Sequence, residues 1–346
     1  MRKVVAGNRA KLFIKSVLGE IFRRVIFRES LFRDTYIILM YHRVRDKIGS
    51  EFDDPALSVS LNSFKMHIKE IVKAFEIVSL PTVLRCPETQ RGMCAITFDD
   101  GWIDTYEVAF PILKKENLPA TVFIPTGLVG KNDAFWFDSL GNLAHAAASR
   151  GRDQLFVEHF RRLAPDWRGD ELSGENLNNL IPLLKKLPAD ILADEIRRGF
   201  DAIGIQPDER RSIINWDNIE EMGAYNIHFG SHGMRHYILP TLETDLKKEE
   251  IFGSLEVLRK ISRAETPLFS YPNGDWDDES LRHVIEAGYE GAVTTQLGLN
   301  NKETNPFLMN RVGFHEAISN TPSLFWFGIF QAYLAGRKKM NFKEFN

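Results

Sequence analysis

The chain has 346 residues, with 44 Lys and Arg against 47 Asp and Glu, and a formal net charge of −3. This near balance argues against nucleic acid as a partner of the whole surface. Two cysteines, Cys86 and Cys94, exclude a disulfide scaffold and a cysteine-based zinc site, so a metal would need histidine and carboxylate ligands. The length suits one large α/β domain or two smaller ones.

Residues 1–35 predict a basic amphipathic helix. Apolar residues recur at helical spacing with basic residues between them: Leu12, Phe13, Val17, Leu18, Ile21, Phe22, Val25 and Ile26, with Lys11, Lys15, Arg23, Arg24 and Arg28. The segment has no long apolar core, so it is a poor signal peptide or spanning helix, and a cytoplasmic location is predicted. Such a helix can lie on the anionic inner face of a membrane, although packing against the domain also explains the pattern.

Residues 316–346 predict a terminal helix with a similar composition. An aromatic run begins at Leu324, and Arg337, Lys338 and Lys339 follow it. A second peripheral membrane contact is therefore predicted here, again with packing against the domain as the alternative.

Strands and helices alternate between residues 36 and 315. The predicted strands are 36–41, 76–80, 94–98, 120–124, 225–230, 268–271, 289–294 and an irregular one at 307–314. One predicted helix begins after Ser60. The others span 102–117, with a kink at Pro111, 215–223, 242–261 and 278–287. Repeated strand and helix units imply a mainly parallel sheet or barrel with right-handed crossovers. Residues 131–211 carry many charges and helix-like stretches, so they predict a helical insertion on one loop.

Two neighbouring carboxylates follow a buried strand. The run Cys94-Ala-Ile-Thr-Phe stops at Asp99, Asp100 and Gly101. Turns are rich in Asp and Gly, so this sequence alone also suits an ordinary turn. Two adjacent carboxylates at a strand end repel each other, however, so a cation or several donors must hold at least one of them ionised.

A histidine pair supplies a partner for these acids. His232 and His236 are four residues apart after the strand at 225–230, which predicts that they share one face of a helical turn. Two histidines and one carboxylate form a catalytic metal site with open positions for water and substrate. His42 and the run Ser270-Tyr-Pro-Asn-Gly274 also follow predicted strands, and all four groups would meet at the mouth of a barrel.

The sequence resembles the polysaccharide deacetylases of carbohydrate esterase family four. The resemblance rests on Thr97-Phe-Asp-Asp-Gly101, Gly230-Ser-His-Gly-Met-Arg-His236 and Phe269-Ser-Tyr-Pro-Asn-Gly274, in that order. It implies an α/β fold, a distorted (β/α) barrel of about seven parallel strands, and a divalent metal, zinc or else cobalt or nickel, that serves hydrolysis of acetyl groups on glycans.

The resemblance also implies site roles. Asp99 corresponds to the general base, and Asp100, His232 and His236 correspond to the metal ligands. Tyr271, Pro272, Asn273 and Trp102 are the expected substrate-binding residues, with a backbone N–H near Asn273 facing the oxyanion.

The chain departs from the family pattern at two positions. Ser270 stands where many members have an arginine that braces the base, and Arg311 is the expected substitute. The family's acid histidine near the carboxy terminus has no clear copy, but Leu39-Met-Tyr-His42 is similar to a rearranged subgroup that acts on poly-N-acetylglucosamine-like polymers. His42 is therefore the expected acid, with His315 as the second choice.

The leading hypothesis is an N-deacetylase of an amino sugar in a polysaccharide or a lipid-linked glycan precursor. A deformylase of a lipid-linked amino sugar, or another amide hydrolase, would use the same groups. The third hypothesis is a glycan-binding protein whose catalytic site is degenerate. Nucleic acid is not an expected partner.

Overall fold

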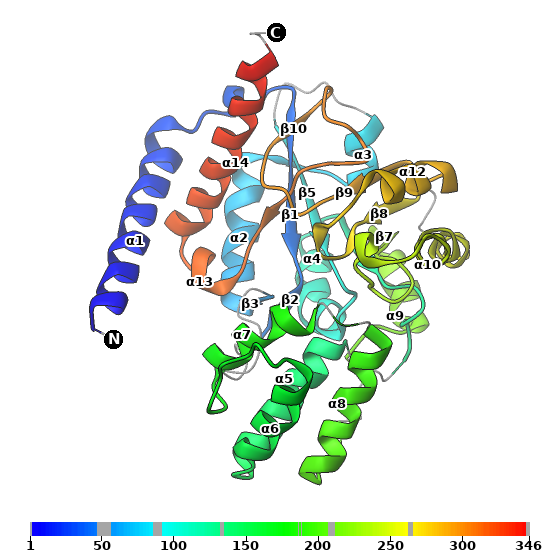
Figure 1. The fold of residues 1–346 in the computed structure, drawn as a ribbon. Helices are drawn as coiled ribbons and strands as arrows, with labels where there is room; N and C mark the ends of the chain where they lie inside the picture. Colours follow the sequence, from blue (N-terminus) through cyan, green and yellow to red (C-terminus); the bar gives the residue numbers. More distant parts are fainter. Residues whose placement is uncertain are drawn as a thin grey trace. The chain divides into compact units, whose positions relative to one another are not determined.

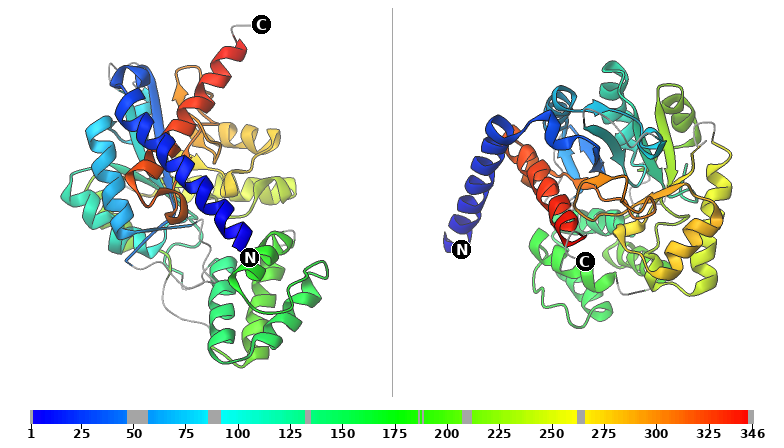
Figure 2. Two further views of the ribbon diagram at one scale, coloured as in Figure 1. Left: turned by 90° about the vertical axis from the view of Figure 1, so that its left-hand side faces the viewer. Right: turned by 90° about the horizontal axis from the view of Figure 1, so that it is seen from above.

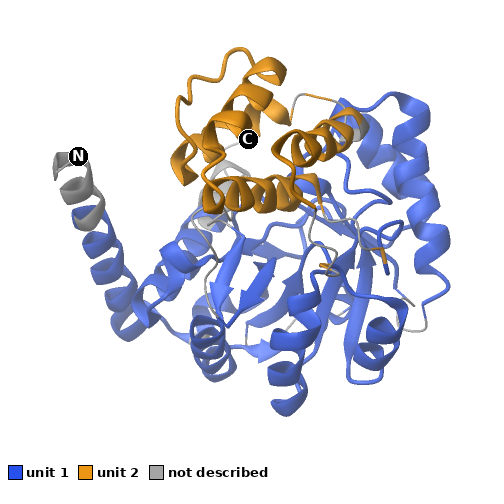
Figure 3. Cartoon of the chain, turned by 90° about the horizontal axis from the view of Figure 1, so that it is seen from below, with its two compact units in different colours: residues 1–46, 56–130, 213–346 blue, residues 47–55, 131–212 orange. Residues whose placement is uncertain are grey.

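The computed structural model describes residues 2–46, 57–85, 92–131, 135–185, 187, 189–206, 212–261 and 266–343. The chain forms two compact units (Figure 3). One consists of Met1–Asp46, Ala56–Gly130 and Ile213–Asn346 and contains the sheet. The other contains the helical stretch Lys131–Ser212.

Six strands of the first unit pair side by side in parallel (Figure 1). In spatial order they are β1 (Thr35–Tyr41), β5 (Met93–Phe98), β6 (Ala120–Ile124), β7 (Ile227–Ser231), β8 (Leu268–Ser270) and β9 (Gly291–Val293). Every residue of β5 and β6 is buried, which explains why these strands are continuously apolar or β-branched instead of alternating. The short β4 (Glu76–Ile77) pairs with β5, and β10 (Asn300–Asn301) pairs antiparallel with β1.

A seventh parallel segment lies between β9 and β1. Met309 forms a parallel bridge with Val293, and β11 (Val312–Gly313) pairs in parallel with β1. The irregular strand expected at 307–314 therefore completes a ring, which Figure 2 shows with helices outside the strands. This confirms the predicted distorted (β/α) barrel of about seven parallel strands. The carboxyl ends of its strands meet at one edge, where parallel barrels place their sites.

Helices connect the strands much as the sequence predicts. They are α2 (Leu61–Ala74), α3 (Leu80–Arg85), α4 (Phe110–Lys115), α9 (Trp216–Gly223), α10 (Thr244–Lys248), α11 (Ser254–Leu258) and α12 (Asp278–Ala287), with the 3-10 turns η4 (Leu239–Thr241) and η6 (Pro272–Gly274). The Ser60 hydroxyl caps α2 by accepting a hydrogen bond from the Ser63 backbone, as its position predicted. The predicted strand 76–80 ends early, because Leu80 and Pro81 begin α3.

Two of the predicted long helices contain a π-helical turn. The helix expected at 102–117 consists of η3 (Thr105–Ala109) followed by α4, and Pro111 lies in the first turn of α4, where its missing N–H is tolerated. The helix expected at 242–261 runs through α10, η5 (Glu249–Gly253) and α11. Such turns often occur at functional sites because they shift the side chains that follow by one position.

The insertion is helical, as expected. It consists of α5 (Trp136–Ser149), α6 (Asp153–Leu163), α7 (Gly174–Leu184) and α8 (Ala189–Ile203). These helices pack around their own apolar core, which includes Leu143, Phe156 and Phe160.

The two terminal helices lie side by side. α1 (Arg2–Ile21) continues into the π-helical turn η1 (Phe22–Ile26) and packs against α14 (Pro322–Lys343), while η2 (Glu29–Phe32) and α13 (Glu316–Ser319) link them to the barrel (Figure 1). Gly19 allows this approach, since a Cβ there would lie 1.8 Å from the Ser323 carbonyl oxygen.

The aromatic run of α14 faces the protein interior. Phe325 and Trp326 are 0 % and 3 % exposed, and Trp326 stacks on Phe75 of the barrel unit. This supports packing against the domain, the alternative given for the run, because the rings of Phe325 and Trp326 fill the space between α14, α2 and η1. The side chains of Arg337, Lys338 and Lys339 lie outside the described residues. Among the described helices, none has both the length and the apolar character to cross a bilayer.

Candidate metal centre

Asp99 and Asp100 stand at the carboxyl end of β5. Pairing with β1 continues to Asp99, whose backbone N–H donates to the Tyr41 carbonyl, and the chain then turns sharply. Asp100 has φ 73° and Gly101 has φ 63°. A left-handed Asp next to a left-handed Gly is a strained turn, so the surrounding structure must fix it. The turn sends the two neighbouring carboxylates to different partners, and both are buried.

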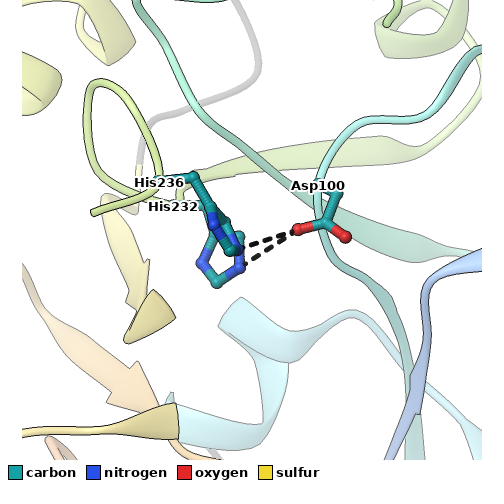
Figure 4. Close-up of side chains that lie close together, drawn as sticks. All are labelled: Asp100, His232 and His236. Carbon is teal, nitrogen blue, oxygen red and sulfur yellow. Dashed lines mark ion pairs between the residues drawn. The ribbon is translucent and has the colours of Figure 1, made fainter. Parts of the chain in front are cut away.

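Asp100 meets the two histidines (Figure 4). Its Oδ1 lies 3.5 Å from Nε2 of His232 and 3.2 Å from Nε2 of His236, and the three ligand atoms lie within 4.8 Å of one another. Residues more than 130 positions apart in the sequence therefore reach one point. This is the arrangement that the sequence predicted for these three residues.

The two histidines do not share a face of a helical turn, and this part of the prediction is wrong. Gly233 and His236 both have positive φ, 75° and 63°, so the chain after β7 forms a loop. Glu250, which is completely buried in η5, accepts hydrogen bonds from the backbone N–H groups of Met234 and Arg235, both at 2.9 Å. The loop thus brings the rings together by backbone geometry that spacing alone does not reveal.

The polar atoms of the three residues fit a divalent metal ion. Nδ1 of His232 lies 2.7 Å from the Ser270 carbonyl oxygen, which can only accept, so Nδ1 carries the proton and Nε2 presents a lone pair. The Trp102 indole N–H donates to Asp100 Oδ2 at 2.9 Å. Asp100 Oδ1 is buried and has no hydrogen-bond partner among the described residues. An orphaned carboxylate oxygen facing two imidazole nitrogens is typical of a metal site.

Arg311 forms a two-point ion pair with Asp99. Its Nη1 and Nη2 donate to Oδ1 and Oδ2 of Asp99 at 2.7 and 2.6 Å, and both side chains are almost completely buried. Nε donates to the Thr294 carbonyl at 2.8 Å, and the remaining N–H bonds reach the hydroxyls of Thr97 and Ser270. All five donors of the guanidinium are used, so its orientation is fixed.

These contacts set the protonation of both carboxyls. Burial raises the pKa of Asp99, but the charge and hydrogen bonds of Arg311, together with the charges of His232 and His42, keep the pKa below its ordinary value. Burial also raises the pKa of Asp100, while the neighbouring imidazoles of His232 and His236 lower it well below the ordinary value. Both groups are therefore ionised at neutral pH despite their burial.

His42 follows β1 at the same edge of the barrel. It is half-buried, and its charge contributes to lowering the pKa of both Asp99 and Asp100. Next to it, Arg43 pairs with Asp104 at 2.7 Å and lies over the Trp102 ring at 4.0 Å. His315, the alternative acid, is also half-buried and begins α13 after β11. The electrostatic contact with both carboxylates favours His42.

Comparisons with known proteins identify the family. Residues 87–292 match the polysaccharide deacetylases. The chain belongs to this family. It is accordingly a hydrolase that acts on amide bonds, and its substrate is a glycan.

Three relatives of this deacetylase are all distant in sequence. YxkH of Bacillus subtilis (strain 168), named for the same family, is 21 % identical over 289 residues, or 82 % of this chain and 73 % of that one. The structure of the Streptococcus pyogenes deacetylase PplD in complex with acetate has a TM-score of 0.57 and 19 % identity, with 86 % of this chain and 98 % of that one covered. A de-N-acetylase from Aggregatibacter actinomycetemcomitans has a TM-score of 0.52 and 14 % identity, covering 85 % and 99 %. These structures share the fold.

The residues predicted to bind substrate divide into two groups. Trp102 and Tyr271 are 0 % exposed and Pro272 is buried, whereas Asn273 is exposed after β8. Trp102 donates to Asp100 and so orients this carboxylate, while its expected contact with substrate stays a prediction. Asn273 is the one of the four whose side chain substrate can reach directly.

The sequence did not point to Glu250 as part of the site. A carboxylate eighteen residues after His232 on a predicted helix reads as an ordinary surface charge. Nothing in the local sequence separates Glu250 from its exposed neighbour Glu249, because two adjacent residues of a helix can both face solvent.

Proposed function

We propose that this deacetylase removes N-acetyl groups from an amino sugar in a polysaccharide or a lipid-linked glycan precursor, with a divalent ion held by Asp100, His232 and His236. The observation that carries the proposal is the buried Asp100 Oδ1, which lacks a hydrogen-bond partner among the described residues and faces both histidine Nε2 atoms. Two imidazoles and one carboxylate suit zinc, and cobalt or nickel accept the same donors. Such an ion polarises an acyl carbonyl and lowers the pKa of water.

Asp99 is the proposed general base. Arg311 keeps it ionised and holds its carboxylate plane still, so the group can accept a proton at an oxygen lone pair that the guanidinium does not use. Because Asp99 precedes Asp100 in the chain, the same strand end positions both the base and a proposed metal ligand.

His42 is the proposed general acid. Departure of an amine requires a proton on its nitrogen, and the His42 imidazole, at the carboxyl end of the strand next to that of Asp99, can donate it. The Arg43–Asp104 pair fixes the chain directly after His42, which keeps the imidazole in place while substrate binds. The backbone around Asn273 is the proposed site of contact with the developing oxyanion.

Two of the similar structures support an acetyl group. One is described in complex with acetate and another as a de-N-acetylase. The choice between a free polysaccharide and a lipid-linked precursor rests on the amphipathic amino-terminal helix, which favours a substrate at a membrane.

The test is release of acetate from partially acetylated and fully acetylated glucosamine oligomers. Protein stripped with a chelator should be inactive, and zinc, cobalt or nickel should restore activity. Asp99→Asn should retain metal and lose at least about 100-fold in kcat, because it removes the base alone. His232→Ala and His236→Ala should lose both metal and activity.

Asp194→Asn provides the matched control, since this aspartate is exposed on α8 of the other unit. It should behave as the unchanged protein does. Retained activity in Asp99→Asn would contradict the proposal. So would release of formate from formylated oligomers with no release of acetate from acetylated ones.

A further inference from the structure

The amino-terminal helix carries an apolar face that the protein leaves exposed. We define it as Phe13, Ile14, Val17, Leu18, Ile21 and Val25. Phe13, Ile14 and Val25 are 70, 57 and 63 % exposed, and the other three are 40 to 44 % exposed. Large apolar side chains in such a contiguous row rarely face water unless something covers them.

The opposite face of the same helix packs on the protein. Gly19 and Phe22 are buried there, and the Phe22 ring lies 4.9 Å from that of Phe330 in α14. The exposed row is thus not the core-facing stripe of the helix. The core-facing stripe of the helix packs on α14. The exposed row forms a second apolar surface, on the side of the helix that faces away from α14. Figure 2 shows α1 at the edge of its unit, beside α14.

The charges around this face have one predominant sign. Residues 10–28, whose side chains the structure describes, contain five basic residues, Lys11, Lys15, Arg23, Arg24 and Arg28, and a single acidic one, Glu20. Glu20 is occupied within the protein by Arg23, Arg24 and the Ser323 hydroxyl. The surface that complements this helix is therefore apolar and negatively charged.

We propose that the exposed face of α1 binds an anionic lipid bilayer, with the helix lying along the surface, its apolar row in the headgroup boundary and its basic side chains on anionic headgroups. A second copy of the chain is a poorer occupant, because two such faces would bring like charges together. The interaction attaches the protein to one leaflet of the bilayer. It does not depend on the proposed chemistry.

The experiment is co-sedimentation of the full chain with vesicles. Vesicles of phosphatidylglycerol and phosphatidylcholine should bind the protein, vesicles of phosphatidylcholine alone should bind it at least about tenfold more weakly, and added salt should reduce the difference. In a triple variant, Phe13→Ser, Val17→Ser and Ile21→Ser, the affinity for anionic vesicles should fall at least about tenfold. Lys11→Glu with Arg28→Glu should abolish the preference for anionic lipid.

A matched triple variant separates this face from general surface hydrophobicity. Leu155→Ser, Ile191→Ser and Ile285→Ser remove apolar side chains that are 44 to 49 % exposed on α6, α8 and α12, and binding should not change. Equal loss in both triple variants would overturn the proposal, as would equal binding to neutral and anionic vesicles. Light scattering that shows a dimer in the unchanged protein and a monomer in the α1 variant, with no vesicle binding, would assign the face to a second copy. Acetate release from a soluble oligomer, measured on all variants, reports failure of the proposed chemistry separately.

Discussion

Arg311 and Asp99 form the central pair of the site, although 212 positions separate them in the sequence. A buried carboxylate without partners would take up a proton, because burial disfavours its charge. The guanidinium counters this tendency with its charge and two direct hydrogen bonds, aided by the charges of His232 and His42, and the hydroxyls of Thr97 and Ser270 accept its remaining inward-facing N–H bonds. Ser270 therefore leaves the space and the hydrogen bond that an arginine arriving from a different strand needs.

Replacing Arg311 with lysine should lower kcat by about 100-fold with little change in KM, because one ammonium cannot hold both oxygens of Asp99. Arg311 lowers the pKa of Asp99, so weakening that contact should raise it. A base with a higher pKa is protonated at higher pH, and the acidic limb of the kcat/KM profile should move to higher pH. The measurement is the pH profile with metal saturating.

Arg282→Lys is the control for this substitution, since Arg282 is exposed on α12. It should change neither kcat nor the profile. If Arg311→Lys reduced kcat with the acidic limb in its original place, Arg311 would support the fold without acting through Asp99.

The π-helical turn η5 decides how the histidine loop is held. Glu249 and Glu250 are adjacent, yet Glu250 is completely buried while the Glu249 side chain is 54 % exposed. Glu250 Oε2 accepts from two successive N–H groups of the loop, and Oε1 accepts from the Arg235 guanidinium at 3.1 Å. A Cβ at Gly233 would lie 2.9 Å from Oε2, so glycine there allows the close approach as well as the positive φ.

Glu250→Gln should weaken metal affinity by about tenfold, because an amide accepts at one atom and cannot hold both N–H groups and Arg235 equally well. The matched control is Glu249→Gln, which removes one exposed ion pair to the same Arg235 and should leave affinity within about twofold. Competition with a chromogenic chelator measures both. The same affinity in both variants would show that the buried carboxylate does not position the ligands.

At the scale of the whole molecule, His67 connects the first strand of the barrel to its last helices. Its Nε2 donates to the Ser319 carbonyl before α14 at 2.7 Å, and its Nδ1 accepts from the Tyr41 hydroxyl of β1 at 3.1 Å. The ring also stacks on Phe325 of α14, 4.4 Å between centroids. Burial lowers its pKa to about 4, so the ring is neutral in the folded protein at neutral pH.

This histidine should make the deacetylase sensitive to mild acid. The unfolded chain takes up a proton at His67 near pH 6.5, whereas the folded one does so only near pH 4, so acidification through this window favours unfolding. The free energy of unfolding should fall by on the order of 2 kcal/mol between pH 7.5 and 5 from this group.

Urea denaturation of the metal-free protein at the two pH values tests this effect. His67→Gln should be less stable than the unchanged protein at pH 7.5, and the difference between the two should narrow at pH 5. Parallel loss of stability in both proteins would assign the acid sensitivity to other groups.

Much of this protein could be predicted from local sequence. The apolar runs predicted the strands, because a strand buried on both faces must be apolar or β-branched, and Ser60 marked the start of α2 through its capping side chain. The carboxylate pair and the histidine pair indicated a site, because each follows a strand and the carboxyl ends of parallel strands meet at one edge of the sheet. What the sequence determined by itself was therefore the order of elements and the candidate groups.

Only the tertiary structure decided which atoms meet. Positive φ at Asp100 and His236 and the inward turn of Glu250 depend on contacts between distant segments, which no periodicity records, whereas the contact of Arg311 with Asp99 was expected from the family resemblance. Packing likewise separated the two apolar terminal segments, burying Phe325 of one and exposing Phe13 of the other. Composition specifies that a side chain can be buried, but the space left by the rest of the chain decides whether it is.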